Sequence, residues 1–169
     1  MKDIMLKNKN ITFNYKEFDS SEELDLSDRK LLNSAHEAAV NAYAPYSGFK
    51  VGASVRLVSG IIVSGSNVEN AAFPSGICAE RNALANASAN HPGDFPVAIA
   101  VAAISGNDLT PGPVSPCGNC RQVIAEEEVR NGTSIRMILG SANKIHVIEK
   151  GGDLLPLQFS RENLKATRR

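Results

Sequence analysis

The chain has 169 residues, of which 43% are hydrophobic and 21% are charged, as is ordinary for a globular domain. Its 18 basic and 18 acidic side chains balance, so no net positive charge attracts a phosphate backbone, and we expect no nucleic-acid partner. No apolar run reaches membrane-spanning length, and none follows the lysines near the N-terminus. We therefore expect no membrane segment and a cytoplasmic location.

The first 26 residues are predicted to be an N-terminal extension, and residues 27–169 a single domain. Within the extension, residues 11–15 alternate apolar and polar side chains, which predicts a short strand. The acidic run from 17 to 28 predicts a solvated loop. Ser27 is expected to cap a helix over residues 28–43, whose leucines and alanines share one face.

The rest of the chain predicts a hairpin followed by alternating strands and helices. Apolar side chains alternate over residues 51–57 and return at 61–63 after a Ser-Gly turn, as in two antiparallel strands. Residues 97–102 are apolar throughout, which is typical of a strand covered on both faces. The remaining elements are two helices and two strands, at about 77–90, 116–130, 135–139 and 144–148. This order predicts an α/β protein, a three-layer α/β/α sandwich around a five-stranded mixed sheet.

All three cysteines lie in two short segments. Gly-Ile-Cys-Ala-Glu-Arg contains Cys78, and Ser-Pro-Cys-Gly-Asn-Cys-Arg, 39 residues further on, contains Cys117 and Cys120. A Cys-x-x-Cys on one helical turn can bind a single Zn²⁺, and a third thiolate leaves the fourth tetrahedral position open. The pattern therefore predicts a catalytic rather than a structural zinc site. An odd number of cysteines also favours a reducing compartment over a disulfide framework.

Glu80, two residues after the first cysteine, is the predicted general acid and base. A carboxylate beside the open position can move protons to and from a zinc-bound water. Ser75 and Ser115 are expected to cap the two helices, which would place all three cysteines in first turns, where the helix dipole lowers thiol pKa values. Three thiolates on Zn²⁺ leave a net charge of about −1. Arg81 is the cation expected to draw charge from the sulfurs.

The two cysteine segments resemble the zinc signature of the cytidine deaminases, Cys-Ala-Glu-Arg followed by Pro-Cys-Gly-x-Cys-Arg-Gln. The resemblance covers roughly residues 30–160. It includes Tyr-Ala-Pro-Tyr-Ser at 43–47, Asn-Val-Glu-Asn at 67–70 and Leu-Leu-Pro at 154–156. It implies the deaminase fold, a zinc cofactor, and hydrolytic removal of the 4-amino group of cytidine or 2′-deoxycytidine in pyrimidine salvage.

The resemblance also implies roles for individual residues. Asn67 and Glu69 would hold the ribose, and Phe49 would pack on the base. The backbone N–H of Ala79 would hold the pyrimidine O2, and the carbonyl of Ser115 would accept from the leaving amine. Phe159 would be supplied to the site of a neighbouring subunit in a homotetramer. The chain departs from the family pattern in two places, with phenylalanine at 73 instead of tyrosine and Leu-Gln at 157–158 instead of Gly-Ala.

Two alternatives stay open. A deaminase of the same fold could act on another aminated pyrimidine, such as a blasticidin-type antibiotic, although residues 67–70 resemble a nucleoside-binding segment. A non-catalytic zinc module would need a closed site with a fourth ligand, most simply a histidine. That hypothesis leaves Glu80 without a role, and no histidine lies in either cysteine segment.

Overall fold

The computed structural model describes residues 7–165. Its seven strands, β1 to β7, span Lys16–Phe18, Phe49–Leu57, Ile62–Ser66, Pro96–Ser105, Asp108–Leu109, Arg136–Gly140 and Ile145–Ile148. The helices α1 to α4 span Leu26–Val40, Ala79–Asn90, Gly118–Asn131 and Arg161–Lys165. Three short 3-10 helices, η1 to η3, span Ser21–Glu23, Phe73–Ser75 and Gly151–Leu154. None of the described helices has the length and apolarity needed to cross a membrane.

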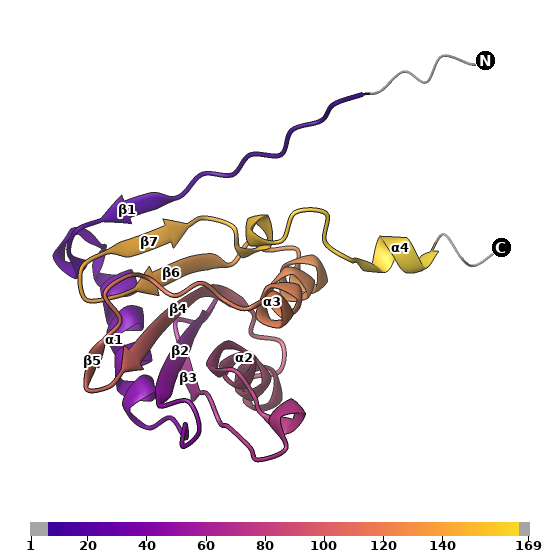
Figure 1. The fold of residues 1–169 in the computed structure, drawn as a ribbon. Helices are drawn as coiled ribbons and strands as arrows, with labels where there is room; N and C mark the ends of the chain where they lie inside the picture. Colours follow the sequence, from indigo (N-terminus) through magenta and orange to yellow (C-terminus); the bar gives the residue numbers. More distant parts are fainter. Residues whose placement is uncertain (1–6, 166–169) are drawn as a thin grey trace.

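The molecule has three layers, with α1 on one face of the sheet and α2 and α3 on the other (Figure 1). The strands follow the order β1-β7-β6-β4-β2-β3, and β5 pairs with β4 outside this path. Strands β4 and β6 are parallel, and the other pairs are antiparallel. The predicted α/β/α sandwich with a mixed sheet is confirmed. The count of five strands was wrong, because the very short strands β1 and β5 bring the sheet to seven.

The N-terminal region differs most from the prediction. Residues 11–15 form no strand, and β1 lies instead at Lys16–Phe18, within the predicted loop, where it pairs antiparallel with β7. A pattern of alternating apolar and polar side chains does not form a strand unless a neighbouring strand pairs with it. Here Ile11, Phe13 and Tyr15 remain exposed. Leu24 is buried in the cluster beneath α1. The domain boundary at residue 27 stays a prediction.

Helix α1 starts two residues earlier than predicted, at Leu26. Its N-cap is Asp25, whose carboxylate accepts a hydrogen bond from the Asp28 N–H at 2.9 Å, so the predicted Ser27 cap was wrong. Ser27 instead donates its hydroxyl to Asp25 at 2.7 Å. Asp is as good an N-cap as Ser, and here it comes two residues sooner.

A buried ion pair and a close backbone contact fix α1 on the sheet. The Asp28 carboxylate is fully buried between Arg136 at 2.6 Å and Arg56 at 3.0 Å. At Gly52 in β2 an added Cβ would lie 2.1 Å from the Ala35 carbonyl oxygen, so only glycine admits the helix here. The buried side chains of α1 then pack against the alanines of β4.

Helix α2 lies equally close to the opposite face. A Cβ at Gly65 in β3 would lie 2.5 Å from the Ala83 nitrogen. This contact positions the first turns of α2 over the sheet. Helix α3 ends at Gly132, a left-handed cap with φ of 66°, as the Asn-Gly stop at 131–132 predicts.

Candidate active site

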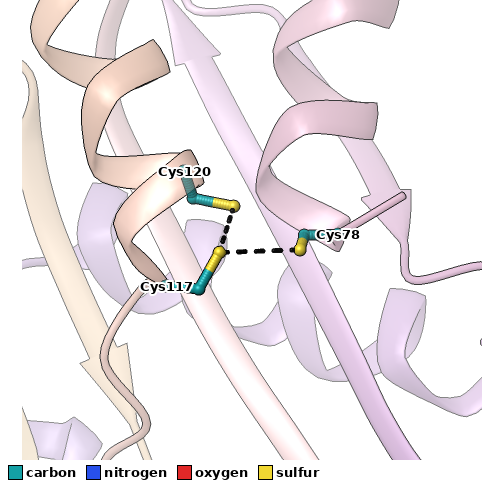
Figure 2. Close-up of side chains that lie close together, drawn as sticks. All are labelled: Cys78, Cys117 and Cys120. Carbon is teal, nitrogen blue, oxygen red and sulfur yellow. Dashed lines mark hydrogen bonds between the residues drawn. The ribbon is translucent and has the colours of Figure 1, made fainter. Parts of the chain in front are cut away.

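The three cysteines meet where α2 and α3 begin (Figure 2). Cys78 is the N-cap of α2, Cys117 is the N-cap of α3, and Cys120 lies in the first turn of α3. The sulfur of Cys117 lies 3.8 Å from that of Cys78 and 3.5 Å from that of Cys120. All three sulfurs lie within 4.8 Å of one another.

The predicted caps Ser75 and Ser115 were wrong, because both helices begin later. Residue 77 is held extended by a backbone bridge to Val68, with N···O distances of 3.0 Å in both directions, so α2 cannot start before Cys78. Ser115 and Pro116 lie before α3, which begins at Gly118 with Cys117 as its N-cap. The cysteines therefore take the capping positions themselves.

The sulfur geometry fits a zinc ion. Tetrahedral Zn–S bonds of about 2.3 Å place sulfurs about 3.8 Å apart, close to the two separations observed. Within residues 7–165, the one group of candidate metal ligands is these three cysteines, and no histidine belongs to it. Three ligands leave one tetrahedral position for a substrate or water, as in catalytic zinc sites. This arrangement counts against the closed, purely structural site.

The charges of the cluster also call for a cation. Burial raises the pKa of the Cys78 thiol, and it raises that of Cys120 with help from the nearby Glu80 carboxylate. Burial alone would raise the pKa of Cys117 too, but hydrogen bonds from the Cys120 backbone and thiol outweigh it, and the pKa falls below its usual value. Three thiolates this close together, one of them the buried Cys120, are stable only beside a positive ion.

Glu80 lies in the first turn of α2, beside the cysteines, and only 5% of its surface is exposed. Burial raises the pKa of its carboxyl, and a hydrogen bond with Cys120 opposes part of that rise. A carboxyl shifted toward neutral pH can both hold and release a proton, as a general acid and base must. The environment of Glu80 thus suits the predicted role.

Two adjoining cavities lie beside the cysteine cluster, and Glu80 lines the smaller one. The smaller, of about 190 Å³, is lined by Glu80 and by the predicted substrate contacts Phe49, Asn67, Ala79 and Ser115. The larger, of about 530 Å³, shares Asn67 and Cys78 with it, and contains Glu69. Tyr46 and Phe73, which sequence reasoning left without a role, meet edge to face in the larger cavity with centroids 5.9 Å apart.

Asn67 and Glu69 both bind the loop that carries Phe49. The Asn67 amide accepts from the Val51 N–H at 2.7 Å and donates to the Phe49 carbonyl at 3.0 Å. The Glu69 carboxylate accepts from the Ser47 hydroxyl and from the Tyr46 N–H, the latter at 2.8 Å. These bonds, the Ser47 hydroxyl first, hold the pKa of Glu69 below its usual value.

Two predicted residues lie outside the two cavities. Phe159 is 59% exposed in the segment that follows η3. Arg81 lines a separate hollow between α2 and α3 with Glu127, and no hydrogen bond or ion pair joins its guanidinium to another described residue. A charge effect of Arg81 on the sulfurs, and a place for Phe159 at a substrate, stay predictions.

Arg121 is the arginine that contacts the cysteine loop, and sequence reasoning gave it no role. Its Nε donates to the Pro116 carbonyl at 2.8 Å, and its Nη1 donates to the Leu154 carbonyl at 2.9 Å. The only signal for it was its place directly after Cys120 in the motif.

Comparison with known proteins gives one answer. The family model of the cytidine and deoxycytidylate deaminase zinc-binding region matches residues 26–133. The chain is 41% identical to a cytidine deaminase of Sporosarcina psychrophila over 138 residues, 80% of this chain and 93% of the relative. It is 34% identical over 145 residues to a cytidine deaminase of Mycobacterium tuberculosis, and the match covers 86% of this chain and 98% of the relative. The crystal structure of cytidine deaminase from Burkholderia pseudomallei superposes with a TM-score of 0.66 at 40% identity, and the match covers 77% of this chain and 97% of that structure. The chain therefore belongs to the zinc-binding cytidine and deoxycytidylate deaminase family.

Proposed function

We propose that this protein is an enzyme that hydrolyses cytidine and 2′-deoxycytidine to uridine and 2′-deoxyuridine, with release of ammonia. The observation that carries the proposal is a buried carboxylate, Glu80, beside three cysteine sulfurs at zinc spacing, in a cavity that also contains Phe49 and Asn67. The relatives that the chain matches are cytidine deaminases, which supports the same reaction.

The chain's residues divide the chemistry among them. Cys78, Cys117 and Cys120 would hold the zinc ion, which would lower the pKa of water and so supply a nucleophile at neutral pH. Glu80 accepts a proton from the attacking water and delivers it to ring nitrogen N3. It then takes the proton of the new C4 hydroxyl, whose oxygen becomes the carbonyl of uridine, and passes it to the departing amine, which leaves as ammonia.

The backbone of the two helix starts orients the base. Ala79 is the first residue of α2, so its N–H has no acceptor within the helix and is free for the pyrimidine O2. The Ser115 carbonyl, across the same cavity, accepts from the amine. Phe49 packs on the ring, and Asn67 and Glu69 position the ribose.

The larger cavity favours a nucleoside over a nucleotide. Among the side chains that line it, Glu69 is the only charged one, and its lowered pKa keeps it anionic. A 5′-phosphate would meet a negative charge and no lysine or arginine there. The amide and carboxylate at 67 and 69 also favour a ribose hydroxyl over the other aminated pyrimidines of the alternative hypothesis.

We further propose a homotetramer that works in pyrimidine salvage in the cytoplasm. Phe159 lies exposed outside the cavities of its own chain, where a neighbouring subunit could receive it. Three free cysteines that bind zinc as thiolates suit a reducing compartment.

Ammonia release and the ultraviolet change from cytidine to uridine test the proposal, measured on wild type and Glu80→Gln. We expect turnover by wild type and a decrease of about 10²- to 10⁴-fold in the variant, the range of general acid–base catalysis. Zinc content should be the same in both, since Glu80 is not a ligand. Failure of the zinc-loaded wild type to act on either nucleoside would reject the substrate, and full activity of Glu80→Gln would reject the mechanism.

A further inference from the structure

Two consecutive side chains of α3 hold both ends of one C-terminal segment, residues 154–159. Arg121 donates to the Leu154 carbonyl at 2.9 Å, and Gln122 donates through Nε2 to the Phe159 carbonyl at 2.8 Å. Both residues directly follow Cys120 in the helix that carries two of the three cysteines. The same helical turn thus contributes to the metal centre and anchors the segment.

The anchored segment contains a backbone conformation that needs support. Leu157 has a φ of 58°, in the left-handed region that a residue with a Cβ rarely adopts, and its side chain is 91% exposed. Because the side chain is exposed, its burial does not offset the strain of this backbone conformation. Such a conformation persists only where its surroundings fix it, and the bonds to Leu154 and Phe159 bracket it.

Helix η3, which leads into the segment, is also fixed to α3. The buried carboxylate of Glu128 accepts from the Gly152 N–H at 3.1 Å and from the Ile135 N–H at 2.8 Å. Beyond Leu157, in contrast, the Gln122 bond is the one hydrogen bond that ties residues 157–159 to α3 in the described chain. The placement of Phe159 therefore depends chiefly on Gln122.

We propose that Gln122 is a positioning residue for substrate binding, which sets the position of the Phe159 ring relative to the metal-binding helix. The inference rests on the proposed function, in which that ring completes the substrate site of a neighbouring subunit. One helix then orients a subunit's own zinc ligands and the aromatic ring that it supplies to its neighbour.

The test measures kcat and KM for cytidine in wild type, Gln122→Glu and Gln122→Lys. Glutamate keeps the shape of the side chain but, when ionised, has no proton to donate, whereas lysine keeps a donor. We expect KM to rise about fivefold in Gln122→Glu, the value of one hydrogen bond, with kcat within about twofold and zinc content unchanged. Gln122→Lys should have a KM near that of wild type. An unchanged KM in Gln122→Glu, or loss of zinc or kcat, would overturn the inference.

Phe159→Ala shows whether Gln122 acts through the ring. In that background Gln122→Glu should raise KM no further, because coupled residues are not additive. A further rise of the same size would show that Gln122 acts by another route and would overturn the inference. Hydrogen exchange of the amides of residues 157–159 gives a readout without turnover. Faster exchange in Gln122→Glu is expected even where cytidine proves to be the wrong substrate, and unchanged exchange would count against the positioning role.

Discussion

Glu69 shows how one side chain can shape the substrate site without contacting the metal centre. Its carboxylate accepts hydrogen bonds from the Tyr46 N–H, the Ser47 N–H and the Ser47 hydroxyl, at the start of the loop that leads to Phe49. An anionic acceptor of three donors is stronger than any neutral one. The residue therefore determines where this loop lies over the cavity.

Glu69→Gln should raise KM for cytidine by about tenfold or more, the cost of losing a hydrogen bond to a charged group. The glutamine amide would also direct N–H groups at the Tyr46 and Ser47 donors. Steady-state kinetics measure the change, with Glu126→Gln as the matched control at an exposed position of α3. Equal KM values for the two variants would contradict the role of Glu69.

His36 is a half-buried residue that the proposed chemistry does not use. Burial lowers the pKa of its imidazole, and its Nε2 has no hydrogen-bond partner in the described chain. Glu37 and Asp108 line the same hollow, but their carboxylates do not outweigh the burial. The folded state thus favours neutral His36, whereas the unfolded chain takes up a proton near pH 6.5.

The sign of the pH effect follows from this difference. Below about pH 6.5 the unfolded state binds more protons than the folded state, so this residue decreases the free energy of unfolding as pH falls. We expect His36→Leu to lose less stability than wild type between pH 7.5 and pH 5.5. Denaturant unfolding at the two pH values measures it. An equal loss in both proteins would show that the pKa of His36 is the same in the folded and unfolded states.

At the scale of elements, α2 depends on its close contact with β3. The helix begins at Ala79 and carries Glu80 in its first turn, after Cys78 as its cap. A methyl group at Gly65 would meet backbone atoms of Ala83 at 2.5 Å, and backbone cannot move aside as a side chain can.

Gly65→Ala should therefore displace α2 and decrease the free energy of unfolding by about 1–3 kcal/mol, as overpacking does. It should also weaken zinc binding, since Cys78 moves with the helix. Gly112→Ala is the control, because nothing lies within 4 Å of its added Cβ. Thermal unfolding and metal content distinguish the two. Gly65→Ala with the stability and zinc of wild type would mean that the helix tolerates the shift.

The same scale shows what the sequence could predict. Strands β2, β3, β4, β6 and β7 follow from periodicity, because their partners bury the alternating or continuous apolar side chains. Strands β1 and β5 are too short for any periodic signal. The start of α2 after Cys78 depends on neighbouring structure, namely the bridge at Ile77. Capping preferences alone favoured the serines and could not predict that Cys78 and Cys117 are the caps.

At the site, the spacing of the cysteines in the sequence predicts the metal-binding cluster better than it predicts the contacts of the neighbouring arginines. Three cysteines at these positions bring their sulfurs together, as expected. Two arginines follow cysteines in the motifs, and sequence cannot tell which way each points. Arg81 turns toward the hollow between α2 and α3, whereas Arg121 binds the Pro116 carbonyl in the cysteine loop. Side-chain direction depends on the packing of the two helices, which the motif does not contain.

At the scale of the whole molecule, the metal site joins two separate helices. Cys78 comes from the start of α2, and Cys117 and Cys120 from the start of α3, 39 residues later. Both helices cover the same face of the sheet, as Figure 1 shows. A zinc ion bound there would cross-link two parts of one layer, and its binding would add to the stability of the fold.

Removing zinc should lower the thermal stability of the whole domain. If free zinc exceeds its dissociation constant about a thousandfold, binding contributes about 4 kcal/mol. For a chain of this size, that corresponds to a fall in Tm of roughly 10 °C on chelation. Differential scanning fluorimetry with and without a chelator measures it, and added zinc should restore the original Tm. Cys120→Ser is the control, since one lost ligand should leave a Tm that responds little to either treatment. A chelated wild type with an unchanged Tm and no bound zinc would show that sheet packing alone holds α2 and α3 in place, and that zinc serves only the chemistry.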